Sequence, residues 1–365
     1  MDKPRVLIVD DESSTLRSLR RGLRRHFKDW EFRYEQSAEQ ALLVLDAFEP
    51  WVVISDKRMP KVDGIQFLSQ VKQRTPLAVR ILLSGETDAD TALPALGVAH
   101  LMLPKPFEMD DLVDALHAAE CLRSLPITPD LKEEIGCISS LPVLPAVYRE
   151  LTEYINQTDE PSNDRIAAIV EQDTAILSKV LQLANSAFFG FSTTTNSAQD
   201  AVFRLGQDML TNLVLFSGLF KQDSSDNTSK HTVVCHQAET VAEIIRALAA
   251  RMDCNRQNQN QHHVIGLLHN VGGLISGEPG PSRRNAIISA YLLKLWGFEK
   301  EIVSAVLNQL EPKTSDDPLT LRLHAAIIIE ASRTQGLDPL DNASGLAIEL
   351  LGQEYQQAIE GYLSQ

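Results

Sequence analysis

The 365-residue sequence has no uninterrupted run of about 18 apolar residues, the length that a membrane-spanning helix requires. We therefore expect no membrane span and no membrane partner. The opening segment, MDKPRVLIVDDESS, has an apolar stretch that is too short for a secretory signal peptide, and acidic residues follow it at once. These two absences predict a cytoplasmic protein.

Cysteine is scarce, and none of the four cysteines lies in a C-x-x-C spacing (Cys121, Cys137, Cys235 and Cys254). This distribution argues against a disulfide framework and against a zinc ribbon. Isolated cysteines of this kind are typical of buried free thiols.

Positive charge is also scarce, because the net charge is −15. Residues 1–124 contain 17 Lys and Arg against 20 Asp and Glu, whereas residues 125–365 contain 17 against 29. An acidic surface repels a phosphate backbone, so we expect no nucleic-acid partner. Composition alone leaves a local basic patch open.

The first 124 residues alternate between short apolar runs and amphipathic segments. Continuous apolar runs such as VLIV and VVIS are typical of strands buried on both faces, and leucines at three- and four-residue spacing indicate helices. The expected strands are 5–11, 31–37, 51–56, 79–85 and 100–107, and the expected helices are 13–27, 38–48, 64–74, 91–97 and 109–124. This order predicts an α/β domain with a doubly wound, five-stranded parallel sheet.

Chemically distinctive residues stand at four of the predicted strand ends: Asp10, Asp11, Asp56, Ser84 and Lys105. The carboxyl ends of parallel strands share one edge, where such sheets place their sites. Three carboxylates at one edge repel one another unless a cation joins them, and Mg²⁺ prefers oxygen ligands. Asp56 could simply cap the next turn, but the four strand ends together favour a carboxylate that accepts a phosphoryl group.

The acid pair, the acceptor aspartate, the hydroxyl residue and the Lys-Pro dipeptide follow one another in this order over the first 122 residues, which resembles a response-regulator receiver domain. The resemblance implies that Asp11 and Asp56 bind Mg²⁺ directly. It also implies that Asp10 binds through water, that the carbonyl of Arg58 completes the site, and that the Lys105–Pro106 peptide bond is cis.

Three positions bear on how such a receiver would switch. Receivers usually carry an aromatic residue three positions before the lysine, where this chain has Met102. Because methionine fills irregular gaps, switching can survive in a softer form. Arg58 and Glu86 lie where the family tunes the lifetime of the phosphate, and they could pair across the entrance. The alternative is ordinary solvated charge.

The first predicted helix carries five arginines that share much of one face: Arg17, Arg20, Arg21, Arg24 and Arg25. A solvated helix face is one interpretation. The other is a docking surface for an acidic phosphodonor protein, since charge complementarity raises association rates.

From Pro126 onward, amphipathic segments follow one another, separated by polar connectors such as 221–229 and 255–261. This pattern predicts an all-helical domain. The motifs LPVLPAVYRELTEYIN, ANSAFFG and GLLHNVGGLI resemble the HDOD family, which is related to metal-dependent HD phosphohydrolases. We predict a receiver at 1–122, a linker at 123–134, an HDOD domain at 135–330 and a helical extension at 331–365.

The resemblance aligns His269 and Asn270 with the central pair of an HD site, and His236 with an upstream ligand. An amide cannot bridge two metal ions as a carboxylate does, so we expect structural histidines and no catalysis. The alternative is that His236 and His269 bind one metal ion weakly. His262 and His263 follow a Gln- and Asn-rich stretch, and we expect them to be exposed.

Together these features predict a two-component response regulator that is not an enzyme, phosphorylated on Asp56 with Mg²⁺ as cofactor. The expected partners are a sensor histidine kinase or phosphotransfer protein, an unidentified protein bound by the HDOD domain, and a second copy of the chain in a homodimer. The alternatives are a receiver-controlled HD-type phosphodiesterase and a DNA-binding regulator.

Overall fold

The computed structural model covers most of both predicted domains. It describes residues 3–85, 94–123, 128, 141–143, 145–157, 161–186, 194–215, 220–222, 225–252, 256–296, 298–312, 317–338 and 353–364. Glu86 and most of the ANSAFFG motif lie outside these residues, as does the first part of the helix expected at 91–97. Over the described ranges, no helix combines the length and the apolar character needed to cross a membrane.

The N-terminal half contains the predicted five-stranded parallel sheet. Its strands are β1 (Arg5–Val9), β2 (Glu31–Glu35), β3 (Val52–Asp56), β4 (Val79–Ser84) and β5 (Leu101–Pro104), in the spatial order β2-β1-β3-β4-β5. Every pairing is parallel. The central strands β1, β3 and β4 are almost completely buried, which explains why they read as continuous apolar runs. The predicted fold class is confirmed.

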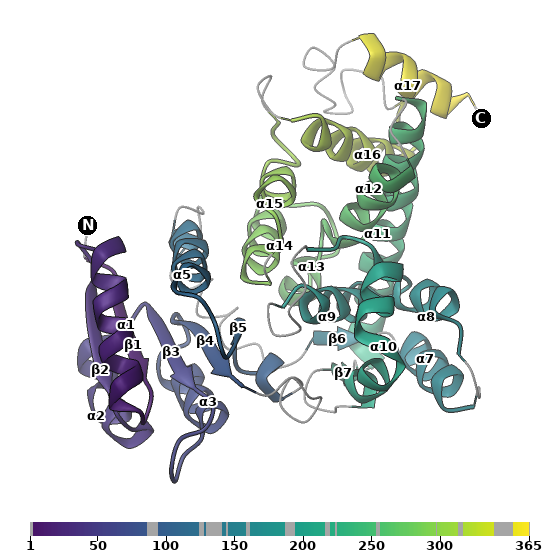
Figure 1. Ribbon diagram of the computed structural model, residues 1–365. Helices are drawn as coiled ribbons and strands as arrows, with labels where there is room; N and C mark the ends of the chain where they lie inside the picture. The colour runs from purple at the N-terminus through teal and green to yellow at the C-terminus, as the bar shows by residue number, and fades with distance from the viewer. Residues whose placement is uncertain are drawn as a thin grey trace.

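Helices cover both faces of this sheet: α1 (Ser13–His26), α2 (Ala38–Phe48), α3 (Gly64–Arg74) and α5 (Met109–Arg123). Helix α1 contacts α5, and α2 contacts α3, so each pair covers one face (Figure 1). Leu16, Leu19 and Leu23 of α1 point into the core, as their spacing predicted. Capping side chains start the next two helices, because Ser37 accepts from the N–H of Gln40 and Asp63 from that of Gln66.

The remaining described chain is mainly helical. Its helices are α7 (Pro145–Gln157), α8 (Asn163–Val170), α9 (Thr174–Ala184), α10 (Ala198–Leu215), α11 (Ser225–Arg251), α12 (Arg256–Leu268), α13 (Gly273–Ser276), α14 (Arg283–Leu295), α15 (Lys300–Leu307), α16 (Pro318–Gln335) and α17 (Gln353–Leu363). A short parallel pair, β6 (Leu141–Val143) and β7 (Phe220–Gln222), was not apparent from the sequence. The domain boundary that we predicted at residue 330 falls inside α16.

Two predicted connectors are wrong. Helix α11 already begins at Ser225, inside the segment 221–229, and α12 begins at Arg256, inside the segment 255–261. Polar residues there resemble a loop in composition, but Gln, Ser and Asn tolerate helical geometry when a neighbour supplies packing. Helices α11 and α12 pack along each other.

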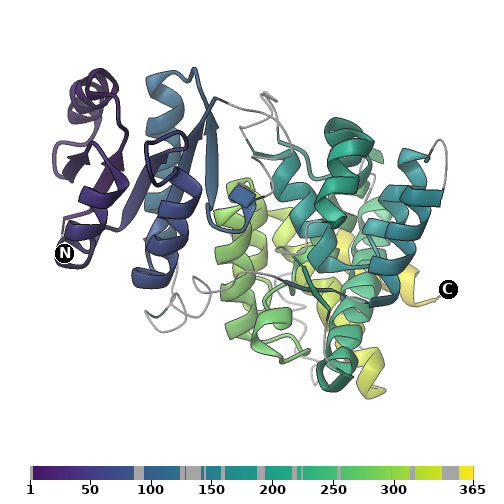
Figure 2. The same ribbon diagram turned by 90° about the horizontal axis from the view of Figure 1, so that it is seen from below.

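The helical half lies on the β5 side of the sheet, away from β2 (Figures 1 and 2). Helix α5 contacts α14 at this junction. A cavity of ≈ 240 Å³ lies between the halves, bordered by Met102 of β5 on one side and by Gln182, Asn185 and Trp296 on the other. The end of β5 is therefore close to helix α9.

Candidate functional site

The sheet places four predicted site residues at the carboxyl ends of four different chain segments. Asp10 follows β1, Asp56 ends β3, Ser84 ends β4, and Lys105 follows β5. The strand register aligns Val9 with Ser55, so the two acids come one residue later at the same edge. The backbone N–H of Lys105 donates to the carbonyl of Ser84 at 2.7 Å, which fixes the start of the Lys-Pro segment against β4.

Lys105 joins the two buried acids. Its Nζ lies 2.9 Å from Oδ2 of Asp10 and 2.6 Å from Oδ1 of Asp56. The other Asp56 oxygen, Oδ2, accepts the backbone N–H of Arg58 at 3.0 Å. The Lys105–Pro106 peptide bond is cis, as the resemblance implied. Both oxygens of Asp56 are thus held in a defined orientation at the sheet edge.

Burial and charge act against each other at this edge. Burial raises the pKa of Asp10, and the hydrogen bonds from Lys105 and from the N–H of Glu12 only partly offset that effect. For Lys105, burial acts to lower the pKa, but hydrogen bonds and charges from Asp56 and Asp10 outweigh it, and the pKa is raised. Lys105 is therefore a cation shared between two carboxylates.

The donor set fits a hard divalent cation. Asp10 is 1% exposed and Asp56 is 7% exposed, while Asp11 is exposed at the mouth of the site. Three carboxylates against one lysine leave an excess of negative charge by count, and burial of Asp10 raises its pKa despite the hydrogen bond from Lys105. Oxygen ligands with excess negative charge are what Mg²⁺ binds. The sequence-predicted metal residues therefore lie at a suitable place, with Arg58 beside them.

Gly64 is a residue of this site that the sequence interpretation missed. A Cβ atom at this position would lie 2.1 Å from the carbonyl oxygen of Asp56, and the backbone N–H of Gly64 donates to the carbonyl of Lys57 at 2.8 Å. Only glycine permits this close approach, which folds the segment after β3 back onto the acceptor strand. The sequence did contain a signal for this close approach. Gly64 is the first residue of a predicted helix, a position that most residues can occupy, so a glycine there indicates a special constraint.

Met102 is buried in β5, pairs with Leu82, and borders the cavity between the halves. Across that cavity, the Nζ of Lys179 donates to Gln182 at 2.9 Å and lies 5.4 Å from the ring centre of Trp296. Burial, together with the charge of Lys72 in the other half, lowers the pKa of Lys179 to about 7. The junction is therefore close enough for charges in the two halves to interact.

Within the described residues, the cluster of His, Cys and Asp side chains at metal-ligand spacing includes neither His236 nor His269. His269 and Asn270 are buried, whereas His236 is exposed on α11. The Nδ1 of His269 lies 2.6 Å from the carbonyl of Gly266, and Asn270 donates to the carbonyl of Pro279 at 2.9 Å. Burial lowers the pKa of His269 to about 4. These groups bond to backbone.

The expectation that the adjacent His262 and His263 are exposed is wrong. His262 is 6% exposed, and its Nε2 lies 2.9 Å from Nη1 of Arg322 on α16. His263 is half-buried, 3.9 Å from Glu171. Because the Gln- and Asn-rich stretch is helical and packed, the histidines that follow it point into contacts with other helices.

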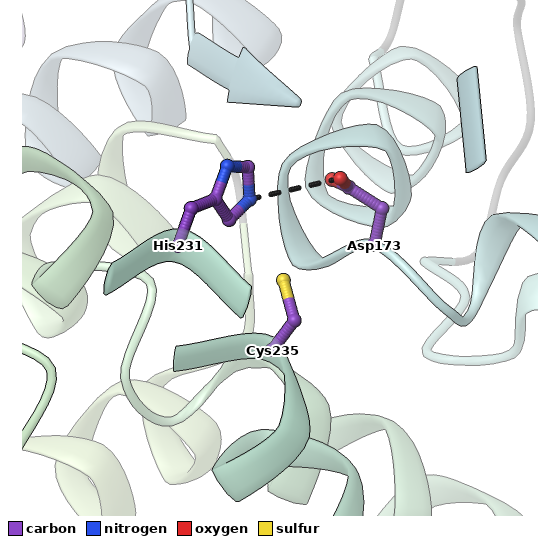
Figure 3. Close-up of side chains that lie close together, drawn as sticks. All are labelled: Asp173, His231 and Cys235. Carbon is purple, nitrogen blue, oxygen red and sulfur yellow. Dashed lines mark ion pairs between the residues drawn. The ribbon is translucent and has the colours of Figure 1, made fainter. Parts of the chain in front are cut away.

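A cluster that the sequence interpretation missed lies elsewhere in the helical half. Asp173, His231 and Cys235 are all buried, and their ligand atoms lie within 4.8 Å of one another (Figure 3). The signal was a histidine and a cysteine four residues apart, but nothing in the sequence indicates that Asp173, 58 positions before His231, lies beside them. The prediction of a buried free thiol is confirmed for Cys235.

Comparison with known protein families matches residues 6–117 to the response regulator receiver domain and residues 141–285 to the HDOD domain. The chain is therefore a response regulator with an N-terminal receiver domain and a C-terminal HDOD domain, and both resemblances are confirmed.

Individual relatives match only part of the chain. It is 36% identical over 118 residues to the hydrogenase transcriptional regulatory protein HoxA of Cupriavidus necator. The matched region covers 31% of this chain and 23% of HoxA. It is 37% identical over 120 residues to the DNA-binding transcriptional regulator NtrC of Escherichia coli. The matched region covers 33% of this chain and 25% of NtrC. The chain thus spans about a quarter of the length of these curated relatives.

Among solved structures, the signal receiver domain of an HD domain-containing protein from Pseudomonas fluorescens is 30% identical. That match covers 34% of this chain and 92% of the solved chain, with a TM-score of 0.32.

Proposed function

We propose that the protein is phosphorylated on Asp56 and signals through an HDOD domain that performs no chemistry of its own. The observation that carries this proposal is the contact of one lysine, Lys105, with both Asp10 and Asp56 at the carboxyl edge of the sheet. That arrangement presents an oriented carboxylate beside a cation that can neutralise a phosphoryl group.

The phosphoryl donor would be a phosphohistidine on a sensor histidine kinase or phosphotransfer protein. An Asp56 oxygen forms a bond to phosphorus as the bond from phosphorus to the donor imidazole nitrogen breaks, and the imidazole keeps that electron pair. Asp10, Asp11, Asp56 and the carbonyl of Arg58 would hold Mg²⁺. When bound, that ion supplies positive charge to the phosphoryl group in transit.

After transfer, Lys105 and Ser84 would bind the new phosphate oxygens. Lys105 then exchanges a carboxylate contact for one to phosphate, which moves the end of β5 relative to β4. Arg58 is exposed at the entrance, where it would influence how quickly water reaches the acyl phosphate. Glu86 is proposed for the same role.

The structure supports a short route from this edge to the helical half. Met102 of β5 lies three residues before Lys105, which follows that strand, and it borders the cavity that Gln182 and Asn185 of the helical half also line. Movement of β5 would therefore shift Met102 and change how it packs at the receiver side of that cavity. A coupling free energy of about 1–3 kcal/mol is sufficient for a useful switch.

The HDOD domain is proposed as a protein-binding output. Asn270 stands where an HD enzyme needs a carboxylate, and its amide is bonded to the carbonyl of Pro279. The helix surfaces would then present grooves to a protein partner or to a second copy of the chain.

The arginines of α1 are exposed in the structure: Arg17, Arg20, Arg21, Arg24 and Arg25. This surface supports the proposal that an acidic phosphodonor docks beside the site. The expected effect of reversing charge there is a slower phosphotransfer that is less sensitive to salt.

A phosphorylation assay tests the acceptor. The full chain is incubated with Mg²⁺ and a small phosphodonor, and its intact mass is measured. We expect the mass of one phosphoryl group to be added to the wild type but not to Asp56→Asn. The matched control Asp46→Asn removes an exposed carboxylate that pairs with Arg74 and should be phosphorylated normally. An unchanged wild-type mass, or full labelling of Asp56→Asn, contradicts the proposal.

Hydrogen exchange tests the output route separately. With Mg²⁺ and beryllofluoride, we expect changed protection at the end of β5 and in α9. Met102→Ala should retain the change around Asp56 but lose most of the change in α9. Changes that stop at residue 122 in the wild type would contradict the coupling, and Mg²⁺-dependent phosphodiester hydrolysis abolished by His269→Ala would contradict the noncatalytic output.

A further inference from the structure

Three potential metal ligands converge in the core of the helical half. Asp173 precedes α9, and His231 and Cys235 lie on α11. One ligand atom from each residue lies within 4.8 Å of the other two, and Figure 3 shows the three side chains pointing toward a common point. The three residues are 0%, 4% and 6% exposed.

The two helices hold these groups in fixed directions. His231 and Cys235 are four residues apart, so they project from the same face of α11, one turn apart. Oδ1 of Asp173 accepts the N–H groups of Ala175 at 2.8 Å and Ile176 at 3.0 Å, which caps α9. This cap leaves Oδ2 directed toward His231 and makes the carboxylate rigid.

The separation of the aspartate and histidine atoms is informative. Oδ2 of Asp173 lies 3.6 Å from Nε2 of His231, which is longer than a good hydrogen bond of about 2.7–3.2 Å. Two ligands at roughly 2.0–2.3 Å from one tetrahedral zinc ion lie roughly 3.3–3.8 Å apart. The observed spacing therefore suits two ligands of a single ion better than it suits a direct bond.

The charges also match one divalent ion. A carboxylate and a thiolate together neutralise a charge of +2, and a neutral imidazole adds a third donor without further charge. A net-neutral centre is the form that a buried position tolerates. Thr174, the first residue of α9, lies beside Cys235, and its hydroxyl donates to the carbonyl of Leu267 at 3.2 Å, which fixes the start of α9 next to the thiol.

We propose that Asp173, His231 and Cys235 bind a divalent cation of the zinc class. Binding forms a bond from the metal to the Cys235 sulfur and releases the thiol proton to solvent. The cluster contains neither His236, which is exposed, nor His269, which bonds to backbone. The competing interpretation is a buried ion pair between protonated His231 and Asp173 with a neutral thiol nearby.

Such an ion would tie α9 to α11. Helix α9 also carries Lys179 and Gln182 toward the receiver, so the metal would hold in place the helix that faces the phosphorylated half. The site is independent of whether Asp56 accepts phosphate.

Cobalt binding tests this site in the full-length chain, prepared without an affinity tag and stripped of metal with a chelator. We expect one Co²⁺ per chain, a near-ultraviolet band from thiolate-to-cobalt charge transfer, and loss of that band when Zn²⁺ is added. Cys235→Ser should lose the band. His231→Ala should bind cobalt roughly tenfold more weakly or worse, while circular dichroism reports whether each variant is folded.

Two matched variants separate this site from its neighbours. Cys254→Ser changes another cysteine, and His236→Ala changes the exposed histidine beside Cys235, so both should keep the band and the stoichiometry. The wild-type measurement alone can overturn the proposal, because folded chain with no thiolate–cobalt band has no such site. A band that survives in Cys235→Ser, or cobalt lost only in His236→Ala, overturns it equally.

Discussion

The edge of the parallel sheet and the HD position of the helical half both collect polar side chains, but they use them differently. At the sheet edge, Lys105 contacts two carboxylates, and Asp11 stands exposed at the mouth. At the HD position, His269 and Asn270 bond to the carbonyls of Gly266 and Pro279.

The two sites differ in charge and in hydrogen-bond partners, and these two properties affect whether a cluster of polar groups can bind a charged ligand. The sheet edge gathers Asp10, Asp11 and Asp56 around Lys105, and burial raises the pKa of Asp10. At the HD position, residue 270 is an amide, and burial lowers the pKa of His269 to about 4. At this second site, His269 and the amide nitrogen of Asn270 bond to backbone carbonyls, while Oδ1 of Asn270 is buried with no hydrogen-bond partner among the described residues.

The largest expected effect comes from restoring a carboxylate to the HD position. Asn270→Asp replaces an amide donor with a buried anion facing the carbonyl of Pro279, and we expect a loss of about 3 kcal/mol or more in the free energy of unfolding. Urea unfolding at neutral and acidic pH measures it, and the loss should shrink when the acid is protonated. A stable Asn270→Asp variant with new metal-dependent phosphodiester hydrolysis would instead show that the HD position can bind a metal ion and catalyse, which contradicts the difference drawn between the two sites.

The next largest effect tests the close approach of the Gly64 backbone to the carbonyl of Asp56. Gly64→Ala places a methyl group against the carbonyl of Asp56, so we expect a loss of about 1–3 kcal/mol in unfolding free energy and slower phosphorylation. Gly97→Ala is the matched control, because its Cβ would lie 3.5 Å from the nearest atom, an ordinary contact. Equal stability of the two variants would show that the backbone can relax.

His269→Ala should be milder. The substitution removes a buried ring whose Nδ1 lies beside the carbonyl of Gly266, and we expect a cost of about 2 kcal/mol. Phosphorylation of the receiver should proceed at the wild-type rate, which the intact-mass time course checks. A changed rate would mean that the two sites are linked more directly than the structure indicates.

The smallest effect is a pH dependence at the sheet edge, measured without divalent cations. Asp10 has a folded-state pKa above the value of 3.8 that an unperturbed carboxyl has, so the native state binds its proton more tightly. The contribution of Asp10 to stability is therefore lost as pH rises from 3.8 through the folded pKa. Asp10→Asn lacks this titration. Its unfolding free energy relative to wild type should increase across that window, and a decrease would reverse the inferred sign.

Much of the sheet edge was predictable from sequence. Continuous runs such as Val6–Val9 identify buried parallel strands, and the residues that follow them must meet at one edge whatever the side-chain details. The role of Gly64 was not predictable in this way, because it depends on how close the segment after β3 comes to Asp56.

The helical half was less predictable. His262 looked exposed from its polar neighbours, yet Arg322 on a helix 60 residues away lies against it. Asp173 and His231 are 58 positions apart in the chain, and no local period relates them. Their meeting depends on how α9 packs relative to α11.

By itself, the sequence determined the two domain types and the identity of the groups at the sheet edge, because parallel strands bring their carboxyl ends together by local rules. Only the tertiary structure decided which histidines are buried, how close β5 comes to the helical half, and that Asp173 meets His231 and Cys235. Helix packing depends on side-chain contacts between distant segments, and a periodic pattern shows which face is buried but not what lies against it.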